Sequence, residues 1–386
     1  MRFRHPAGSV VHLAYCSNVH PAEDVDGVIY QLSRFAAPLK ETLDVPCLGV
    51  GLWLAAPVAA ALLEDTSSLD RLRSTLGAHD LEVVTFNGFP YRAFHAPVVK
   101  RDVYVPDWTD PTRADYTLDL AWLLALLLPD DVEEGSISTL PLGWRTDWSE
   151  RSTDEARYAL ERVTEGLEKL AGETGRKVRL ALEPEPGCVV ETVEGAIEAL
   201  EGVDPEWIGV CLDACHMAVQ FEDPEASLTA LREASIPVCK AQISSALHVS
   251  HPGDPKARNK LAGFAEPRFL HQTRERTPKG IVGVDDLDDA LAGELPTENE
   301  WRIHFHVPIH HSGDDTTQSE LAASLDALLG GESPATKHLE VETYTWSVLP
   351  PSDRPEDDAG LVGGLARELS WTRERLLELG LRGVGR

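Results

Sequence analysis

The chain has 386 residues, of which 42% are hydrophobic and 26% are charged, so it holds enough apolar material for a large buried core. Its 35 Lys and Arg residues against 64 Asp and Glu residues give a net charge of −29. Because so acidic a surface repels phosphate backbones and anionic membranes, we expect no nucleic-acid partner and no direct membrane insertion.

The cysteines and the hydropathy of the sequence indicate the cellular compartment in which the protein is expected. Six cysteines are scattered along the chain without a CxxC pair, so the sequence predicts free thiols rather than a disulfide framework. The first 16 residues contain no sustained apolar stretch, and we expect no signal peptide. The longest apolar segment, 118–128, is too short to span a bilayer. These features favour a reducing, cytoplasmic location.

Short strand-like runs alternate with helical patterns along the chain, which predicts parallel strands joined by crossover helices. The expected strands cover residues 10–16, 47–54, 81–86, 136–140, 178–183, 208–213, 236–243, 301–309 and 338–344. The expected helices cover residues 22–43, 57–64, 68–78, 110–128, 152–172, 192–200, 224–233, 318–329 and 360–381. This alternation predicts an α/β (β/α)8 TIM barrel that forms a single domain over residues 1–386. A doubly wound open sheet is the alternative, but no GxGxxG follows the first strand.

Two segments depart from the regular alternation. A loop at 87–109, after the third strand, is rich in aromatic residues and proline and far longer than the usual connection of about 2–6 residues. An insertion of approximately 245–300 follows the seventh strand, with helical patches expected at 264–276 and 284–291. We expect the loop to cover one end of the barrel.

Acidic residues close several of the predicted strands, at the end of a barrel where function is usually found. Glu183 ends the fifth strand, Asp213 ends the sixth with His216 three residues later, and Glu340 and Glu342 share a face of the last. Glu342 is the nearer of those two to the strand end. Glu183, Asp213, His216 and Glu342 are a reasonable shell for Mn²⁺, Mg²⁺, Co²⁺ or Zn²⁺. The alternative for each is a solvated acid or a structural ion pair.

Further polar residues follow the seventh strand. Lys240 and Gln242 share a face, where Lys240 suits the stabilisation of developing negative charge and Gln242 suits a substrate contact or a weak metal ligand. The segment 301–311 holds four histidines, and His304 and His306 alternate onto one face. Such clustering suits metal ligation or acid–base work, although no HExxH spacing is present. We predict His306 as a catalytic residue beside Glu183, Glu342 and Lys240.

Amide and aromatic groups near the other strand ends predict a pocket for a small polar or carbocyclic ligand. The candidate substrate-binding residues are Asn18, His20, Asn87, Tyr91, His95, Trp144 and Gln242. An ordinary packed loop is the alternative explanation of the aromatic residues at 89–95.

The Glu at the end of the fifth strand, the Asp213-x-x-His216 pair and Glu342 resemble the xylose-isomerase-like TIM barrels, the superfamily of sugar phosphate isomerases and epimerases. Within it, the stretches YCSNVHP (15–21), GSISTLPLGW (135–144), LALEPEPGC (180–188) and HLEVETYTW (338–346) look like the EboE-type metabolite-traffic proteins, as does the whole segment 85–109. The resemblance implies a divalent metal at Glu183, Asp213, His216 and Glu342. It also implies partner proteins from the same bacterial gene cluster. Many relatives have a histidine where this chain has Gln242, which implies either a weaker metal site or a fourth metal position left to water or to His306.

The function expected from these features is a metal-dependent isomerase, epimerase or lyase. It would act on a small hydroxylated or carbonyl metabolite in the maturation or traffic of secondary-metabolite precursors. The alternative is a non-catalytic binding or carrier protein on the same barrel. An endonuclease IV-like phosphodiesterase is disfavoured by the net charge of −29.

Overall fold

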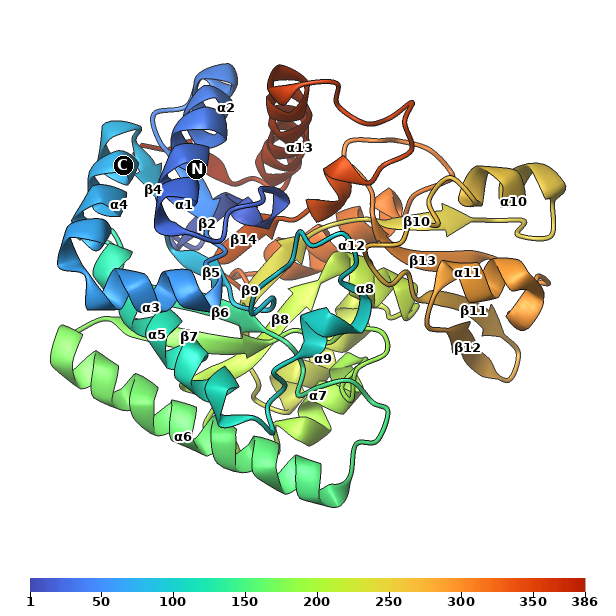
Figure 1. Ribbon diagram of the computed structural model, residues 1–386, viewed down its shortest axis with the longest axis horizontal. Helices are drawn as coiled ribbons and strands as arrows, with labels where there is room; N and C mark the ends of the chain where they lie inside the picture. The colour runs from blue at the N-terminus through green and yellow to red at the C-terminus, as the bar shows by residue number, and fades with distance from the viewer. Residues whose placement is uncertain (386) are drawn as a thin grey trace.

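Parallel strands close into a barrel at the centre of the molecule (Figure 1), in a computed structural model that describes residues 1–385. The barrel strands are β2 (Val10–Cys16), β3 (Leu48–Gly51), β4 (Leu81–Glu82) continued by β5 (Thr85–Asn87), β6 (Glu134–Thr139), β7 (Lys177–Leu182), β8 (Ile208–Asp213), β9 (Val238–Ile243) and β14 (His338–Val341). Strand β14 closes the ring because it pairs in parallel with β9 on one side and with β2 on the other. With β4 and β5 taken as one position, residues 1–385 supply eight barrel strands, and the predicted TIM barrel is confirmed.

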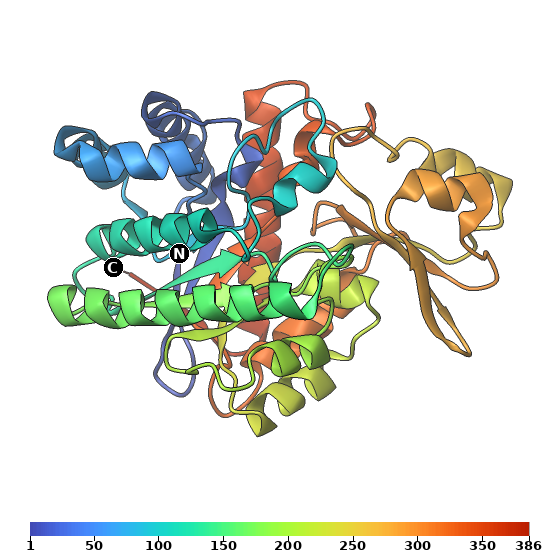
Figure 2. The same cartoon turned by 60° about the horizontal axis from the view of Figure 1, so that its bottom comes forward.

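Helices cover the outside of the barrel. They are α1 (Val25–Gln31), a π-helical turn η2 (Leu32–Ala36), α2 (Ala37–Leu43), α3 (Ala56–Glu64), α4 (Thr66–Ala78), α5 (Pro111–Leu127), α6 (Glu150–Thr174), α7 (Val193–Ala199), α8 (Ala214–Val219), α9 (Pro224–Glu233), α12 (Gln318–Leu329) and α13 (Asp358–Glu378). Figure 2 shows α5 and α6 side by side along one face of the barrel. The helix predicted at 22–43 is therefore interrupted by η2.

Aspartate side chains begin many of these helices. Asp24 accepts a hydrogen bond from the N–H of Gly27, and Asp110 accepts one from the N–H of Thr112 in front of Pro111. Such caps satisfy otherwise unpaired N–H groups and place a negative charge at the positive end of the helix dipole. Part of the acidic composition is therefore structural. Helix α6 begins earlier than predicted because Ser149, and not Ser152, is its N-cap.

The long loop after β5 contains a 3-10 turn, η3 (Lys100–Tyr104). Arg113 of α5 is fully buried beneath this loop and donates hydrogen bonds of 3.0 Å to the carbonyl oxygens of Gly88 and Phe89. It also donates one of 2.8 Å to the carbonyl oxygen of Pro106. Because the guanidinium binds both ends of the loop, it holds the segment against the barrel.

The insertion after β9 builds a small antiparallel sheet that projects from one side of the barrel (Figures 1 and 2). Its elements are β10 (Ala246–Val249), α10 (Pro255–Leu261), β11 (Thr273–Thr277), β12 (Gly280–Val284), α11 (Leu287–Asp289), η4 (Ala290–Glu294) and β13 (Trp301–His306). The sheet order is β10-β13-β11-β12, so it extends past the predicted limit near 300 to include β13. The helix predicted at 264–276 is wrong, because Pro267 interrupts the pattern and β11 pairs with both β12 and β13.

The two ends of the described chain meet at the opposite end of the barrel from the pocket-forming loops. Strand β1 (Arg2–Arg4) pairs antiparallel with both β2 and β15 (Arg382–Val384). No helix within residues 1–385 is both long enough and apolar enough to cross a membrane.

Candidate functional site

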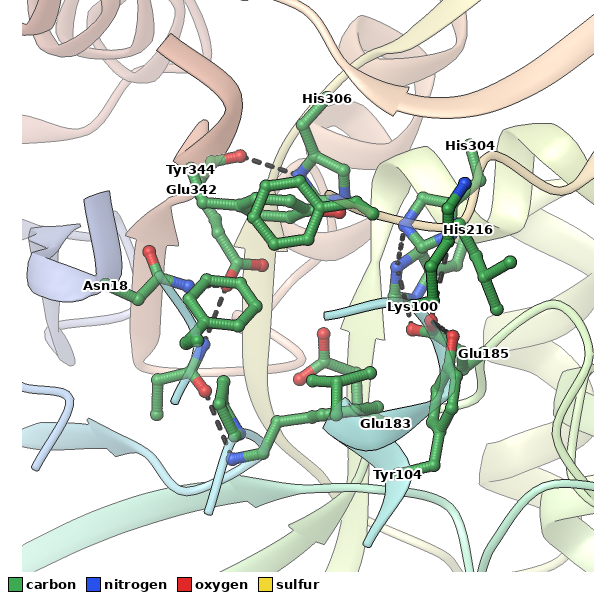
Figure 3. Close-up of a pocket in the computed structure, with 17 residues that line it drawn as sticks. Asn18, Lys100, Tyr104, Glu183, Glu185, His216, His304, His306, Glu342 and Tyr344 are labelled. Atoms are coloured by element: carbon green, nitrogen blue, oxygen red, sulfur yellow. Dashed lines mark hydrogen bonds and ion pairs between the residues drawn. The ribbon is translucent and has the colours of Figure 1, made fainter. Parts of the chain in front are cut away.

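A pocket opens at the carboxyl ends of the barrel strands, between the loop after β5 and the insertion (Figure 3). The space not filled by atoms, including the part open to solvent, is about 490 Å³. Its lining residues are Asn18, Asn87, Phe89, Pro90, Phe94, Lys100, Val103, Tyr104, Glu183, Glu185, His216, Phe269, Leu270, His304, His306, Glu342 and Tyr344. The acids follow the ends of barrel strands, and the histidines come from α8 and from β13 of the insertion. Most of the apolar residues come from the loop and the insertion. The pocket thus combines a polar floor with an apolar wall.

Three predicted metal ligands converge beneath this pocket. Glu183 follows β7, Asp213 ends β8 and Glu342 follows β14, and each offers an oxygen within 4.8 Å of the others. All three are almost completely buried, at 3%, 1% and 5% exposure. Three carboxylates this close repel one another in a low-dielectric interior, so the arrangement favours a cation among them.

Two side-chain amides orient Glu342. Asn18 lies in the 3-10 turn η1 (Ser17–Val19) and Asn87 ends β5, and each donates a hydrogen bond of 2.7 Å to Oε1 of Glu342. Both residues also line the pocket, as expected for the predicted substrate contacts. Because both amides bind the same oxygen, the other oxygen of Glu342 remains available to face Glu183 and Asp213.

Asp213 is held by the start of the following helix. Its Oδ1 accepts hydrogen bonds from the backbone N–H of His216 at 2.9 Å, as the N-cap of α8, and from Oγ of Ser244 at 2.8 Å. Its Oδ2 is buried and has no hydrogen-bond partner among the described residues. These hydrogen bonds hold Oδ1 of Asp213 in place and leave its Oδ2 directed at the carboxylates of Glu183 and Glu342.

Burial dominates the electrostatics of these acids. It raises the pKa of Glu183 well above its usual value, and repulsion from Glu342 and Asp213 adds to the effect. Burial also raises the pKa of Glu342 well above its usual value, with Asp213 and Glu340 contributing in the same direction. Each shift reflects the cost of ionising a buried carboxyl group, increased by the neighbouring acids.

Gln242 and His306 lie next to the carboxylates. Gln242 is fully buried in register with Asp213, and its two side-chain polar atoms have no hydrogen-bond partner in the part of the chain described. Nδ1 of His306 donates a hydrogen bond of 2.8 Å to the carbonyl oxygen of Glu342. The other ring nitrogen, Nε2, has no hydrogen-bond partner within residues 1–385. Since a carbonyl oxygen only accepts, that Nε2 carries a lone pair. His306 also groups with Asp213 and His216 as a set of close ligand atoms.

The structure places Lys240 deeper in the barrel, outside the pocket lining of the described residues. Its ammonium forms a 2.6 Å ion pair with Glu340 and donates to the carbonyl oxygen of Phe86 at 3.1 Å. Glycine is required opposite this pair, because a Cβ on Gly51 would lie 1.3 Å from Oε1 of Glu340. Lys240 thus lies beneath the three carboxylates of Glu183, Asp213 and Glu342.

The other predicted substrate-binding residues lie around the pocket rather than in the lining found within residues 1–385. His95 packs behind Asn18, with 2.7 Å between its Nε2 and the carbonyl oxygen of Asn18. His20 stacks on Phe35 with ring centroids 4.2 Å apart. Tyr91 packs against Tyr116, and Trp144 against Tyr104. A direct substrate contact by these four residues remains a prediction.

Sequence reasoning did not single out several residues that line the pocket. Glu185, Tyr104 and Lys100 are among them, and Gln272 lies directly behind His304 of the predicted histidine cluster. The repeated Glu-Pro at 183–186 and the alternation of His304 with His306 were the available signals. No local pattern points to Gln272, since it follows an irregular segment of the insertion.

The family profile of the xylose isomerase-like TIM barrels matches residues 47–287, which is more than half of the chain. The chain belongs to this family. A search of curated proteins finds no significant match. The matched segment of this xylose isomerase-like barrel contains Glu183, Asp213 and His216, whereas Glu342 lies beyond it.

Solved structures share the barrel at low sequence identity. A xylose isomerase-like TIM barrel protein from Mycobacterium smegmatis, in complex with magnesium, is 14% identical with a TM-score of 0.52, over 96% of this chain and 97% of that one. A protein from Anabaena variabilis, described as a candidate sugar phosphate isomerase/epimerase, is 15% identical with a TM-score of 0.50, over 96% of this chain and all of that one. At this identity the likeness shows the fold.

The residues of this xylose isomerase-like barrel are consistent with a divalent metal ion. Glu183 Oε2, Asp213 Oδ2 and Gln242 Oε1 are buried oxygens without hydrogen-bond partners among residues 1–385. A buried oxygen in a native protein normally has a partner, so these atoms indicate a missing one. Carboxylate and amide oxygens suit hard cations such as Mg²⁺ and Mn²⁺, and a nearby imidazole suits Zn²⁺ or Co²⁺.

Proposed function

We propose that the protein is a metal-dependent isomerase or epimerase that acts on a small hydroxylated or carbonyl metabolite. The observation that carries this proposal is the convergence of Glu183, Asp213 and Glu342 within 4.8 Å of one another under a pocket. Gln242 and His306 are candidates for a fourth metal ligand, in addition to His216, which was predicted from the sequence. A divalent ion held there would bind substrate oxygens and polarise a carbonyl group.

The same carboxylates are suited to move protons. Isomerisation and epimerisation both remove a proton from a carbon next to a carbonyl and return one to the substrate. Glu183 and Glu342 extend from strands that are separated by β8 and β9, so they approach a bound substrate from different directions. Burial raises the pKa of both carboxyl groups, which favours a proton on one while the other is ionised. We propose that one takes the proton and the other returns it.

His306 is a second proposed proton carrier. Its Nε2 carries the lone pair, and burial lowers the pKa of the ring below its ordinary value, so the imidazole is neutral at pH 7. A neutral imidazole at the pocket edge can accept a proton from a substrate hydroxyl. Lys240 would act from below, where its charge lowers the electrostatic cost of a negative group at the barrel centre.

The shape of the pocket supports a substrate with an apolar part. Phe94, Phe269 and Tyr344 pack together above the acids, with ring centroids between 4.9 and 5.3 Å apart. A fully hydroxylated sugar would leave much of this wall without a matching surface, whereas a carbocyclic or partly apolar ketone would cover it. The resemblance to EboE-type proteins supports a substrate of the same kind. We propose that it is a precursor of a secondary metabolite and that the protein acts on it in the cytoplasm together with partner proteins.

The test combines metal loading with proton exchange. The purified protein, loaded with Mn²⁺, is incubated in D2O with a panel of ketohexoses and hydroxylated cyclic ketones, and NMR follows deuterium entering next to the carbonyl. We expect exchange with at least one compound, and we expect Glu183→Gln and Glu342→Gln each to abolish it. The control is Glu298→Gln, a conservative change of an exposed acid, which should exchange normally.

Three results would contradict this proposal. If no divalent metal binds, the metal-dependent reaction is excluded. If metal binds but no compound exchanges or turns over, the protein is better explained as a carrier. If it cleaves duplex DNA at an abasic site with added Zn²⁺ or Mn²⁺, it is a phosphodiesterase of the endonuclease IV type instead.

A further inference from the structure

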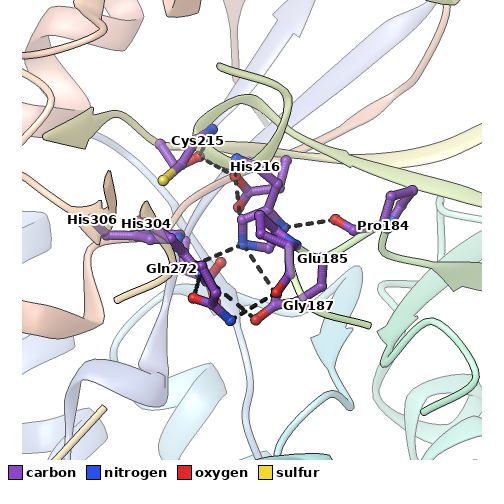
Figure 4. Close-up of polar contacts among 12 residues, drawn as sticks. Pro184, Glu185, Gly187, Cys215, His216, Gln272, His304 and His306 are labelled. Atoms are coloured by element: carbon purple, nitrogen blue, oxygen red, sulfur yellow. Dashed lines mark hydrogen bonds and ion pairs between the residues drawn. The ribbon is translucent and has the colours of Figure 1, made fainter. Parts of the chain in front are cut away.

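A second group of ligand atoms lies beside the three carboxylates (Figure 4). Glu185 comes from the segment after β7, His216 from α8 and His304 from β13 of the insertion. All three are at most 5% exposed, and their ligand atoms lie within 4.8 Å of one another. The Nε2 atoms of His216 and His304 are 3.0 Å apart, and Oε2 of Glu185 is 3.2 Å from Nε2 of His216.

The hydrogen bond on the far side of His216 determines where its proton lies. Nδ1 of His216 is 2.9 Å from the carbonyl oxygen of Pro184. A carbonyl oxygen only accepts, so Nδ1 carries the hydrogen. In the neutral ring, Nε2 then has a lone pair that points at His304.

The same reasoning applies to His304 through Gln272. The side-chain nitrogen of Gln272 is 2.7 Å from the carbonyl oxygen of Pro186, which fixes the orientation of the amide. Its oxygen Oε1 is therefore the atom that lies 2.8 Å from Nδ1 of His304. That Nδ1 must carry the hydrogen, and Nε2 of His304 has the lone pair. Two lone pairs thus face each other at 3.0 Å without a hydrogen between them.

Glu185 adds a third electron donor to this pair. Its Oε1 accepts a hydrogen bond of 2.8 Å from the hydroxyl of Tyr104, which in turn accepts one of 3.0 Å from Gln272. Its Oε2 is then the atom directed at His216. Every outer hydrogen bond in the cluster is satisfied, and when Glu185 is ionised all the inward-facing atoms are acceptors. Such an arrangement needs a cation between them.

We propose that Glu185, His216 and His304 form a second metal site that takes Zn²⁺ or a similar borderline cation such as Co²⁺. Two imidazole nitrogens and one carboxylate oxygen are a ligand set typical of zinc sites that keep a fourth position open. All three residues line the pocket, so the open position faces the substrate space. Outer hydrogen bonds from Pro184, Gln272 and Tyr104 orient the ligands, as is usual in zinc centres. This site shares no residue with the three carboxylates of the proposed function, and it assigns His216 to the second ion rather than to the first.

The competing explanation is a proton shared between the two rings. It requires a buried imidazolium ion next to other histidines, and burial with repulsion from His216 and His306 lowers the pKa of His304 well below its ordinary value. The neighbouring Glu185 carboxylate favours such a proton, so the two explanations are separated by measuring metal.

The experiment counts metal ions in the full chain. The purified protein is stripped with a chelator, titrated with Co²⁺ while the visible spectrum is followed, and then analysed for bound metal. The variants are Glu185→Gln and His304→Gln in the second site, Glu183→Gln in the first, and His311→Gln as a matched exposed control. Circular dichroism verifies that each variant is folded, and anomalous scattering from crystals of the unaltered protein locates the ions independently of any substitution.

We expect two Co²⁺ ions per chain in the unaltered protein and in His311→Gln, and one in each of the other variants. Loss of a ligand should lower the affinity for the second ion by more than the roughly 10–100-fold that follows the loss of an outer hydrogen bond. Retention of the second ion in both Glu185→Gln and His304→Gln would overturn the proposal. So would a single ion that Glu183→Gln removes, although the proposed function would then stand. A single ion that His304→Gln removes and Glu183→Gln retains would instead support the second site and contradict the proposed function.

Discussion

Asn87 donates a 2.7 Å hydrogen bond from its side-chain amide to Oε1 of Glu342, and Asn18 donates a second of the same length to the same oxygen. The two amides come from β5 and from the turn after β2, so three barrel positions meet at one carboxylate. Asn87 was expected to contact substrate. The structure gives it a further role, which is to orient an acid whose other oxygen faces the proposed metal.

Replacing Asn87 with leucine should weaken metal binding without unfolding the barrel. The substitution keeps the side-chain size but removes the donor, so Glu342 is free to rotate. An outer hydrogen bond of this kind typically contributes about 10–100-fold to metal affinity. Titration with Mn²⁺, with free Mn²⁺ measured by EPR, tests the expected weakening. Asn259→Leu on the exposed face of α10 is the control, and an unchanged dissociation constant in Asn87→Leu would contradict the role.

Replacing Lys240 with methionine should strongly destabilise the protein. Lys240 and Glu340 are both fully buried and 2.6 Å apart, so the change leaves a carboxylate without its counter-charge. Breaking a buried pair in this way costs about 3–5 kcal/mol of unfolding free energy, whereas replacing both partners costs much less. Urea unfolding of Lys240→Met and of Lys240→Met with Glu340→Gln measures the difference.

The same variants separate a structural from a catalytic role for Lys240. If the double variant recovers stability and also recovers the exchange activity, Lys240 acts through its pairing with Glu340. If stability returns but activity does not, the predicted catalytic role of the ammonium is supported. Equal stability of the single and double variants would contradict the importance of the ion pair.

Stability of the metal-free protein should fall as pH rises above 7. Burial raises the pKa of Glu183 and Glu342 well above the usual value for a glutamate, and it raises the pKa of Glu185 to about 8. The folded state therefore holds protons that the unfolded state has lost. The free energy of unfolding then decreases by about 1.4 kcal/mol per pH unit for each such carboxyl group until the pH passes its folded-state pKa, which for Glu185 is about 8. The buried histidines, with lowered pKa values, act in the opposite direction only below about pH 6.5.

Bound metal should remove this dependence, because a cation replaces the protons among the acids. Urea unfolding at pH 7.0, 7.75 and 8.5, with metal and with chelator, tests the expectation. Glu183→Gln should reduce the slope of the metal-free protein. Parallel curves for the two forms would show that these acids do not hold the ion.

The strand ends could be predicted from the sequence because Glu183 and Asp213 directly follow apolar runs, and Glu342 ends a run in which apolar and polar residues alternate. Glu183, Asp213 and Glu342 close strands that must be parallel, and parallel strands in a barrel bring their carboxyl ends together. The proximity of the three carboxylates therefore follows from the chain order and the alternation of side chains.

The histidine and glutamine partners could not be predicted in the same way. His304 and Gln272 are brought to His216 by the antiparallel sheet of the insertion, and neither the pairing nor the register of such a sheet can be inferred from a mixed segment rich in proline, glycine and charge. The helix expected at 264–276 shows the same limit, since a local helical pattern there was overridden by strand pairing.

The loop after β5 should behave as a cover that opens independently of the barrel. It contacts the insertion through the backbone N–H groups of Val99 and Lys100, which bind the carbonyl oxygen of Arg268 at 2.8 and 2.7 Å. The ammonium of Lys100 pairs with Asp286, and Phe94 packs on Phe269 with ring centroids 5.1 Å apart. Arg113 holds the two ends of the loop against the barrel, but the part between them has fewer backbone hydrogen bonds than a barrel strand. Local opening of this middle part should therefore need less free energy than global unfolding.

Removing Phe94 should open this cover more than removing the ion pair. A partly exposed pair such as that of Lys100 contributes about 0–1 kcal/mol, whereas a buried phenylalanine side chain contributes several. We therefore expect amide hydrogen exchange in residues 89–104 to rise at most about fivefold in Lys100→Met and by a much larger factor in Phe94→Ala. Val98→Ala, at a side chain that is 58% exposed, is the control. Mass spectrometry of peptides from β7 and β8 should show no change in any variant, and faster exchange there would mean that the loop and the barrel open together.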